Sequence, residues 1–152
     1  WNYPKGHPRS RESGDVCARH ARRAVRAAGY DNELAELVAA MIRDHAFSKG
    51  VVPDTLEGKI LQDADRLDAI GAIGIARCFA SCAEMGSAFY DLDDPFAERR
   101  PLDDKRFGLD HFEKKLLRLE AGMHTEAAKV MAAERSQVMR AFLAAMRREI
   151  GG

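Results

Sequence analysis

The sequence lacks any apolar run that approaches the ~20 residues a helix needs to span a bilayer. It also lacks an excess of either charge, since its 152 residues contain 24 Lys plus Arg and 24 Asp plus Glu. A net charge of zero favours neither an extended nucleic-acid surface nor binding to an acidic membrane. We therefore expect no membrane partner, and the composition argues against nucleic acid as a partner.

Cysteine is scarce and forms no framework. Cys17, Cys78 and Cys82 show no zinc-type or redox-type spacing, and the last two are four residues apart, which places them on one face of a helix. An odd number of cysteines without a disulfide framework is typical of a reducing compartment. We therefore expect a cytoplasmic protein.

Strict alternation of apolar and polar residues, the signal of a half-buried strand, is also absent. The apolar residues instead recur at helical spacing, so the sequence predicts an all-α fold of five or six helices in a single domain over residues 1–152. The expected helices run from Asp15 to about Ala28, from a cap at Asp31 or Asn32, from a cap at Thr55, from a capping box of Asp110 and Glu113, and from about Thr125 to Gly151.

The apolar spacing also predicts which helix faces are buried. The expected buried residues are Leu34, Leu37, Val38, Met41 and Ile42 in the second helix; Leu56, Ile60, Ala64, Leu67 and Gly71 in the third; Phe112, Leu116 and Leu119 after the long loop; and Met131, Val138, Phe142, Ala145 and Met146 in the last. Gly71 and Gly74 are expected to allow the close approach of another backbone, or a bend. The loop over 86–108 is either an ordered lid or binding loop, or mobile.

The segment Gln62–Gly71 is the most unusual of the chain, because it places three carboxylates and Arg66 within an otherwise apolar helix. An ionised carboxylate in such a place is costly unless it is paired or bound to a metal. Asp63 and Asp65 point about 160° apart, so they cannot share one small ligand on a straight helix. An ion-pair network that fixes helix packing explains the segment as well as a catalytic site does.

Two further groups of residues allow more than one interpretation. His45 continues the apolar stripe of the second helix, where a histidine is either a core residue or a pocket residue. Arg19, Arg22, Arg23 and Arg26 form a basic face that is either solvated or able to contact the phosphates of a nucleic acid.

The string from Gln62 to Arg77, QDADRLDAIGAIGIAR, resembles the last metal-binding helix of the HD-domain phosphohydrolases, especially a small bacterial stand-alone subgroup. Weaker similarities follow the family order in segments 42–47, 94–96, 111–117 and 123–125. The resemblance therefore covers nearly the whole chain and implies an all-α fold. It also implies a divalent metal cofactor, which could be Mn, Fe, Mg, Ni or Co.

The resemblance implies roles for individual residues. Asp65 corresponds to the family's last metal ligand, and Asp63 to an acid that supports it. His45 and Asp68 are the candidate catalytic residues, although Asp68 can equally be a packing acid. Arg66 and Lys115 either contact the phosphate or pair structurally, and His111 is expected to act in local capping and packing.

The family's early histidine and adjacent His-Asp pair have no match in this sequence. We expect them upstream of Trp1, in N-terminal helices of a longer chain. The implied activity is metal-assisted hydrolysis of a phosphate ester or anhydride, with a nucleotide or another small phosphorylated molecule as substrate. The alternative is a catalytically incomplete HD-fold module with a regulatory or interaction role.

Overall fold

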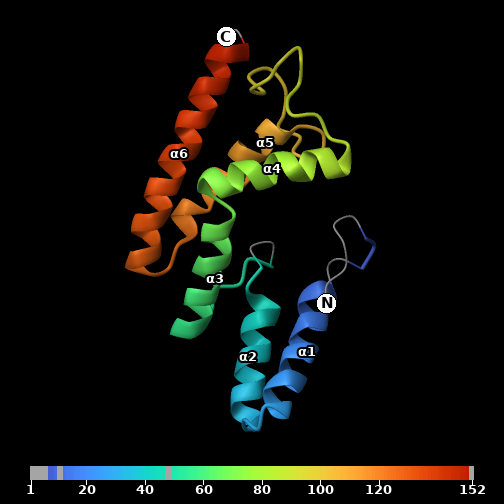
Figure 1. Ribbon diagram of the computed structural model, residues 1–152, viewed down its shortest axis with the longest axis vertical. Coiled ribbons are helices and arrows are strands. Elements are labelled where there is room, and N and C mark those ends of the chain that lie inside the picture. Colours follow the sequence, from blue (N-terminus) through green and yellow to red (C-terminus); the bar gives the residue numbers. More distant parts are fainter. Residues whose placement is uncertain (1–6, 10–11, 47–48, 151–152) are drawn as a thin grey trace. The chain divides into compact units, whose positions relative to one another are not determined.

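The computed structural model describes residues 7–9, 12–46 and 49–150, so that Trp1, Phe47 and Gly151 lie outside the described part (Figure 1). The α-helices are α1 (Ser13–Ala27), α2 (Asn32–Asp44), α3 (Leu56–Asp68), α4 (Gly71–Met85), α5 (Gly108–Lys114) and α6 (Glu126–Ile150), and two short 3-10 helices, η3 (Leu116–Arg118) and η4 (Glu120–Gly122), precede α6. The described residues contain no strand and one isolated bridge, Ala88 to Phe107. The all-α prediction is confirmed.

The chain divides into two compact units, residues 1–65 and 66–152, which are described separately. The single domain expected over residues 1–152 stays a prediction. None of the described helices is long and apolar enough to cross a membrane.

In the first unit α1 and α2 pack against each other as a helical hairpin (Figure 1). The predicted cap of α2 is confirmed, because the Asp31 carboxylate accepts a hydrogen bond from the backbone N–H of Leu34 at 2.8 Å. The predicted buried stripe of α2 is wrong at Leu34, which is 36% exposed, whereas Ala35 and Ala39 are fully buried. Small alanine side chains let two helix backbones approach closely, and the other residues of the predicted stripe are half-buried: Leu37, Val38, Met41 and Ile42.

Helix α3 begins as predicted, with the Thr55 hydroxyl accepting a hydrogen bond from the Gly58 N–H at 3.1 Å. The face predicted to be buried is wrong at Leu56, Ile60 and Ala64, all of which are exposed, the first two at 61% and 52%. Polar residues further along the helix are buried instead: Gln62, Asp63 and Arg66. Burial of such groups is tolerated where hydrogen bonds replace those to water.

A bend was one expectation around Gly71 and Gly74, and the structure shows a full break between α3 and α4. Helix α3 ends at Asp68, and α4 begins at Gly71, whose φ of 77° lies in the left-handed region that favours glycine. At Gly74 the backbone of Ala69 approaches closely, because a Cβ atom at this position would lie 2.3 Å from the Ala69 carbonyl oxygen.

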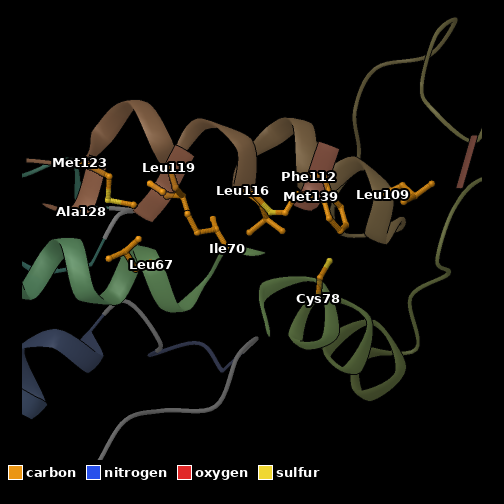
Figure 2. Close-up of a cluster of buried hydrophobic side chains, with 11 residues drawn as sticks. Leu67, Ile70, Cys78, Leu109, Phe112, Leu116, Leu119, Met123, Ala128 and Met139 are labelled. Carbon is orange, nitrogen blue, oxygen red and sulfur yellow. The ribbon is translucent and has the colours of Figure 1, made fainter. Parts of the chain in front are cut away.

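The hydrophobic core lies in the second unit, where the end of α3, α4, α5, η3 and α6 meet (Figure 2). Phe112, Leu116 and Leu119 are 0–4% exposed, as predicted. Helix α6 buries Ala128, Ala132, Ser136 and Met139. The prediction for α6 is right for Phe142 and Met146, which pack against the core, and Ala145 is half-buried. It is wrong for Met131 and Val138, which are 41% and 47% exposed because the buried face is rotated by one residue.

The capping box predicted at Asp110 and Glu113 is wrong. Helix α5 starts at Gly108 after Phe107, with no side-chain cap, so Asp110 lies inside the first turn. Its carboxylate is 1% exposed and binds an arginine from the preceding loop instead of the helix N-terminus. The guanidinium offers this carboxylate two N–H donors at once, at 2.5 and 2.9 Å.

Candidate functional site

The acids of α3 occupy different environments. Asp63 is buried with 3% exposure, whereas Asp65 is exposed. This difference agrees with their predicted divergence around the helix, and it leaves the Asp65 carboxylate accessible to a ligand. The expected roles of Asp65 as metal ligand and Asp63 as its support stay predictions.

His45 follows the last residue of α2 and is half-buried. Its Nδ1 lies 2.6 Å from the carbonyl oxygen of Ile42. A carbonyl oxygen can only accept, so Nδ1 carries the proton and the neutral ring keeps a lone pair on Nε2. That nitrogen is the atom a catalytic base or a metal ligand requires.

Gln62 positions the backbone next to His45. Its Nε2 donates to the carbonyl oxygens of Asp44 at 3.1 Å and Val51 at 2.6 Å, and the side chain is fully buried. Gln62 therefore ties α3 to the end of α2 and to the loop that follows. Sequence reasoning assigned it no role, although a glutamine inside an apolar helix was the available signal.

The Arg66 side chain contacts the end of η4 and the segment that follows it. Its Nη1 donates to the carbonyl oxygen of Gly122 and lies 3.0 Å from Nε2 of His124. Arginine cannot accept a hydrogen bond, so His124 must accept through Nε2. The structural pairing that was one expectation for Arg66 is thus present, although the sequence did not indicate His124 as a partner. Contact of Arg66 with a phosphate stays a prediction.

The other candidates of the second unit lie in separate surroundings. Asp68 forms an exposed ion pair with Arg77 of α4. Lys115 is half-buried between α5 and η3, and its backbone N–H donates to the carbonyl oxygen of His111. The His111 ring lies 3.1 Å from the Asp104 carboxylate, a local contact of the kind expected for it.

The basic face of α1 is partly used for packing. Arg22 makes two hydrogen bonds of 2.6 Å to the carboxylate of Glu36 in α2, and Arg26 adds a third at 3.2 Å. These contacts lower the pKa of Glu36 below its usual value. Two of the four arginines therefore form ion pairs between α1 and α2, which weakens the nucleic-acid alternative.

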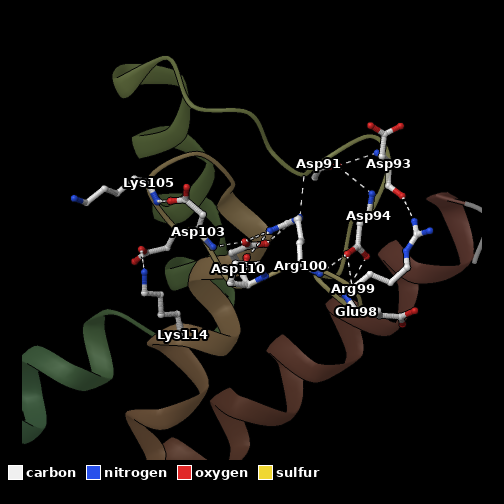
Figure 3. A network of polar contacts seen from close by, with 12 residues as sticks. Asp91, Asp93, Asp94, Glu98, Arg99, Arg100, Asp103, Lys105, Asp110 and Lys114 are labelled. Carbon is white, nitrogen blue, oxygen red and sulfur yellow. Dashed lines mark hydrogen bonds and ion pairs between the residues drawn. The ribbon is translucent and has the colours of Figure 1, made fainter.

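The segment over 86–107 is held in place by aspartates (Figure 3). The buried Asp94 carboxylate accepts the backbone N–H groups of Glu98, Arg99 and Arg100 at 2.8–3.1 Å. These bonds stabilise a turn that contains Ala97 at a φ of 51°, a conformation that side chains rarely adopt. The loop thus has a defined conformation, and its role as a lid or binding loop stays a prediction.

A buried ion pair fixes the loop to α5. The Arg100 guanidinium makes two hydrogen bonds of 2.5 and 2.9 Å to the Asp110 carboxylate, which also accepts the Asp103 N–H at 2.6 Å. The same guanidinium lies 4.4 Å from the ring centre of Phe107. The Asp110 charge is thus fully compensated.

Acid should loosen this loop. Hydrogen bonds from the Arg99 N–H and its neighbours hold the pKa of Asp94 below its usual value of 3.8. A carboxylate with a lowered pKa in the folded state stabilises the protein above its unfolded pKa, and this stability is lost as the pH falls through the folded pKa. We expect urea stability to decline from about pH 4 downward, and the decline to be shallower in Asp94→Asn. Equal slopes for both proteins would contradict this assignment.

The described residues contain no group of three or more His, Cys, Asp or Glu side chains able to hold a metal ion. Within this part of the chain, Asp65 is at most one ligand of such a site. The divalent cofactor implied by the resemblance therefore does not fit the described residues alone.

Comparison with known proteins places the chain among bacterial relatives, although no family model matches it. The uncharacterised protein YpgQ of Bacillus subtilis is 40% identical over 100 residues, which are 66% of this chain and 43% of YpgQ. The crystal structure of the Lin1889 protein from Listeria innocua has a TM-score of 0.72 and 30% identity, covering 91% of this chain and 68% of the Listeria protein. The chain belongs to the same family as Lin1889.

Two other solved structures describe related proteins. YpgQ in complex with ADP has a TM-score of 0.71 and 34% identity, over 89% of this chain and 64% of YpgQ. An HD-superfamily hydrolase from Bacillus thuringiensis has a TM-score of 0.69 and 32% identity, over 93% of this chain and 66% of the hydrolase. The chain thus spans about two thirds of these structures and less than half of the YpgQ sequence.

Proposed function

We propose that this protein acts as a metal-dependent phosphohydrolase of the HD superfamily, with a nucleotide as substrate. The observation that supports the proposal most is its 32% identity to an HD-superfamily hydrolase over nearly its whole length. The ADP complex of the related YpgQ supports a nucleotide, without indicating which bond is cleaved.

Asp65 is the proposed metal ligand of this chain. Its carboxylate is exposed on α3, and Asp63, two residues earlier on the buried side, would support the helix from within. A complete site needs ligands beyond those that the described residues bring together. Oxygen and nitrogen ligands of this kind accept manganese, iron, magnesium, nickel or cobalt, and such an ion lowers the pKa of a bound water.

His45 is the proposed acid-base residue. Because Nδ1 is engaged by the Ile42 carbonyl, only Nε2 can exchange a proton with water or a leaving group. Asp68, which pairs with Arg77, is proposed as a second catalytic residue, and Lys115 as a substrate-binding residue. Arg66 is proposed as a substrate-binding residue that contacts the phosphate while its Nη1 still donates to the carbonyl oxygen of Gly122.

A second candidate function is an HD-fold interaction module without catalysis. The observation in its favour is that the described residues do not form a complete metal site. Such a module would bind a nucleotide or a protein partner without turnover, and would bind no stoichiometric divalent ion.

Both candidates are tested by metal analysis and a nucleotide panel on the full-length protein. We expect about one divalent ion or more per chain, and phosphate or pyrophosphate release from at least one nucleoside di- or triphosphate. Chelation should abolish release, and re-addition of manganese or magnesium should restore it. A protein that contains no metal and hydrolyses nothing in the panel would favour the interaction module.

A further inference from the structure

A cavity of about 620 Å³ lies in the second unit, between the 86–107 loop, α5 and α6. This volume falls within the roughly 300–1,000 Å³ of small-molecule sites. Its lining is largely apolar and includes Leu102, Leu109, Leu117 and Leu143. None of the residues proposed above for hydrolysis lines it, so the inference below does not depend on that function.

One wall of the cavity is formed by Phe96 and Leu102, which the ordered loop contributes. The Asp94 hydrogen bonds and the Arg100–Asp110 ion pair hold this loop in place (Figure 3). The wall is therefore formed in advance and costs little ordering entropy when a ligand binds.

Two arginines stand at the rim, on the same side of α6 and two turns apart: Arg140 and Arg147. Arg140 makes one bond of 3.0 Å to Glu120, and Arg147 one of 2.5 Å to Glu98. Both pairs are substantially exposed, and surface pairs of this kind contribute little. Each guanidinium has five N–H donors, so most of them remain available to a ligand.

The cavity also offers a planar surface. The Arg147 guanidinium lies 4.0 Å from the ring centre of Phe96, so the two planes together form a platform on which an aromatic group can stack. Of the two lining carboxylates, Asp110 is neutralised by Arg100, and Glu113 adds a negative charge to those of Glu98 and Glu120, which pair with the two arginines.

The geometry points to a binding site for a small amphipathic anion, with a planar apolar body in the cavity and its acidic group on Arg140 and Arg147. The acidic group can be a carboxylate, sulfonate or phosphate, because all three accept two hydrogen bonds from a guanidinium. Glu113 limits the affinity for such an anion, and removing its charge should therefore strengthen binding.

The test uses 8-anilinonaphthalene-1-sulfonate, a fluorescent aromatic sulfonate, titrated into the full-length protein. We expect one saturable site, weakened roughly three- to tenfold by Arg140→Ala or Arg147→Ala and strengthened about twofold by Glu113→Gln. Arg148→Ala is the matched control, because it removes the same charge from the same helix outside the cavity lining, and it should change the affinity less than twofold.

Two further measurements separate this site from general dye binding to exposed apolar residues. N-phenyl-1-naphthylamine, the neutral analogue, should bind several-fold more weakly than the sulfonate, and Ala144→Trp should fill the cavity and remove most of the saturable signal. Equal losses in Arg147→Ala and Arg148→Ala would overturn the inference. Equal affinity for the neutral dye, or unchanged binding in a folded Ala144→Trp variant, would also overturn it.

Discussion

Replacing Asp65 by Asn should reduce nucleotide hydrolysis by about a hundredfold or more and lower the bound metal in parallel. The substitution preserves the size of the side chain and removes its charge. Because Asp65 is exposed on α3, the loss of that charge should leave the thermal unfolding of the metal-free protein almost unchanged. The measurement is the metal content per chain together with turnover at saturating metal.

Glu57→Gln is the matched control, since Glu57 is another exposed acid of α3, located in its first turn. It should retain both metal and activity within twofold. Asp63→Asn should behave differently from both, because Asp63 is buried and its substitution should lower stability as well as activity. Full metal content and turnover in Asp65→Asn would show that Asp65 is not a ligand.

Replacing Asp110 by Ala should cost about 3 kcal/mol of the free energy of unfolding. Asp110 is 1% exposed and is the main partner of the Arg100 guanidinium. Its removal leaves that largely buried charge with only the Asp91 carboxylate at 3.7 Å and the Pro101 carbonyl at 3.3 Å, and the Asp103 N–H without its acceptor. Loss of the loop anchor should also increase proteolysis between residues 91 and 107. Urea denaturation and limited trypsin digestion measure the two effects.

A double-mutant cycle separates the ion pair from simple loss of packing. Arg100→Met alone should be destabilising, whereas Arg100→Met combined with Asp110→Leu should recover much of the loss, because no buried charge then remains unpaired. Asp93→Ala, an exposed acid of the same loop, should change stability by less than about 0.5 kcal/mol. Additive effects of the two core substitutions would contradict a direct Arg100–Asp110 coupling.

Helix α3, which contains most of the segment Gln62–Gly71, shows which features could be predicted from the sequence and which could not. Helical periodicity places Asp63 and Asp65 on different sides of α3, and their burial and exposure agree with it. The same periodicity assigned Leu56 and Ile60 to the interior, where Gln62 lies instead. The apolar pattern predicted the wrong buried residues here, because the carbonyl groups that accept hydrogen bonds from Gln62 belong to Asp44 and Val51, more than ten residues away in the chain.

What the sequence alone determined is therefore local: the helical class, the caps at Asp31 and Thr55, and the break at Gly71. These features depend on hydrogen bonds and backbone angles within a few residues. Only the tertiary structure decided that Asp110 binds Arg100 instead of capping α5, and that α6 turns Val138 to the surface. The physical reason is that a polar group becomes buried only where distant segments supply its partner, and sequence spacing does not contain that information.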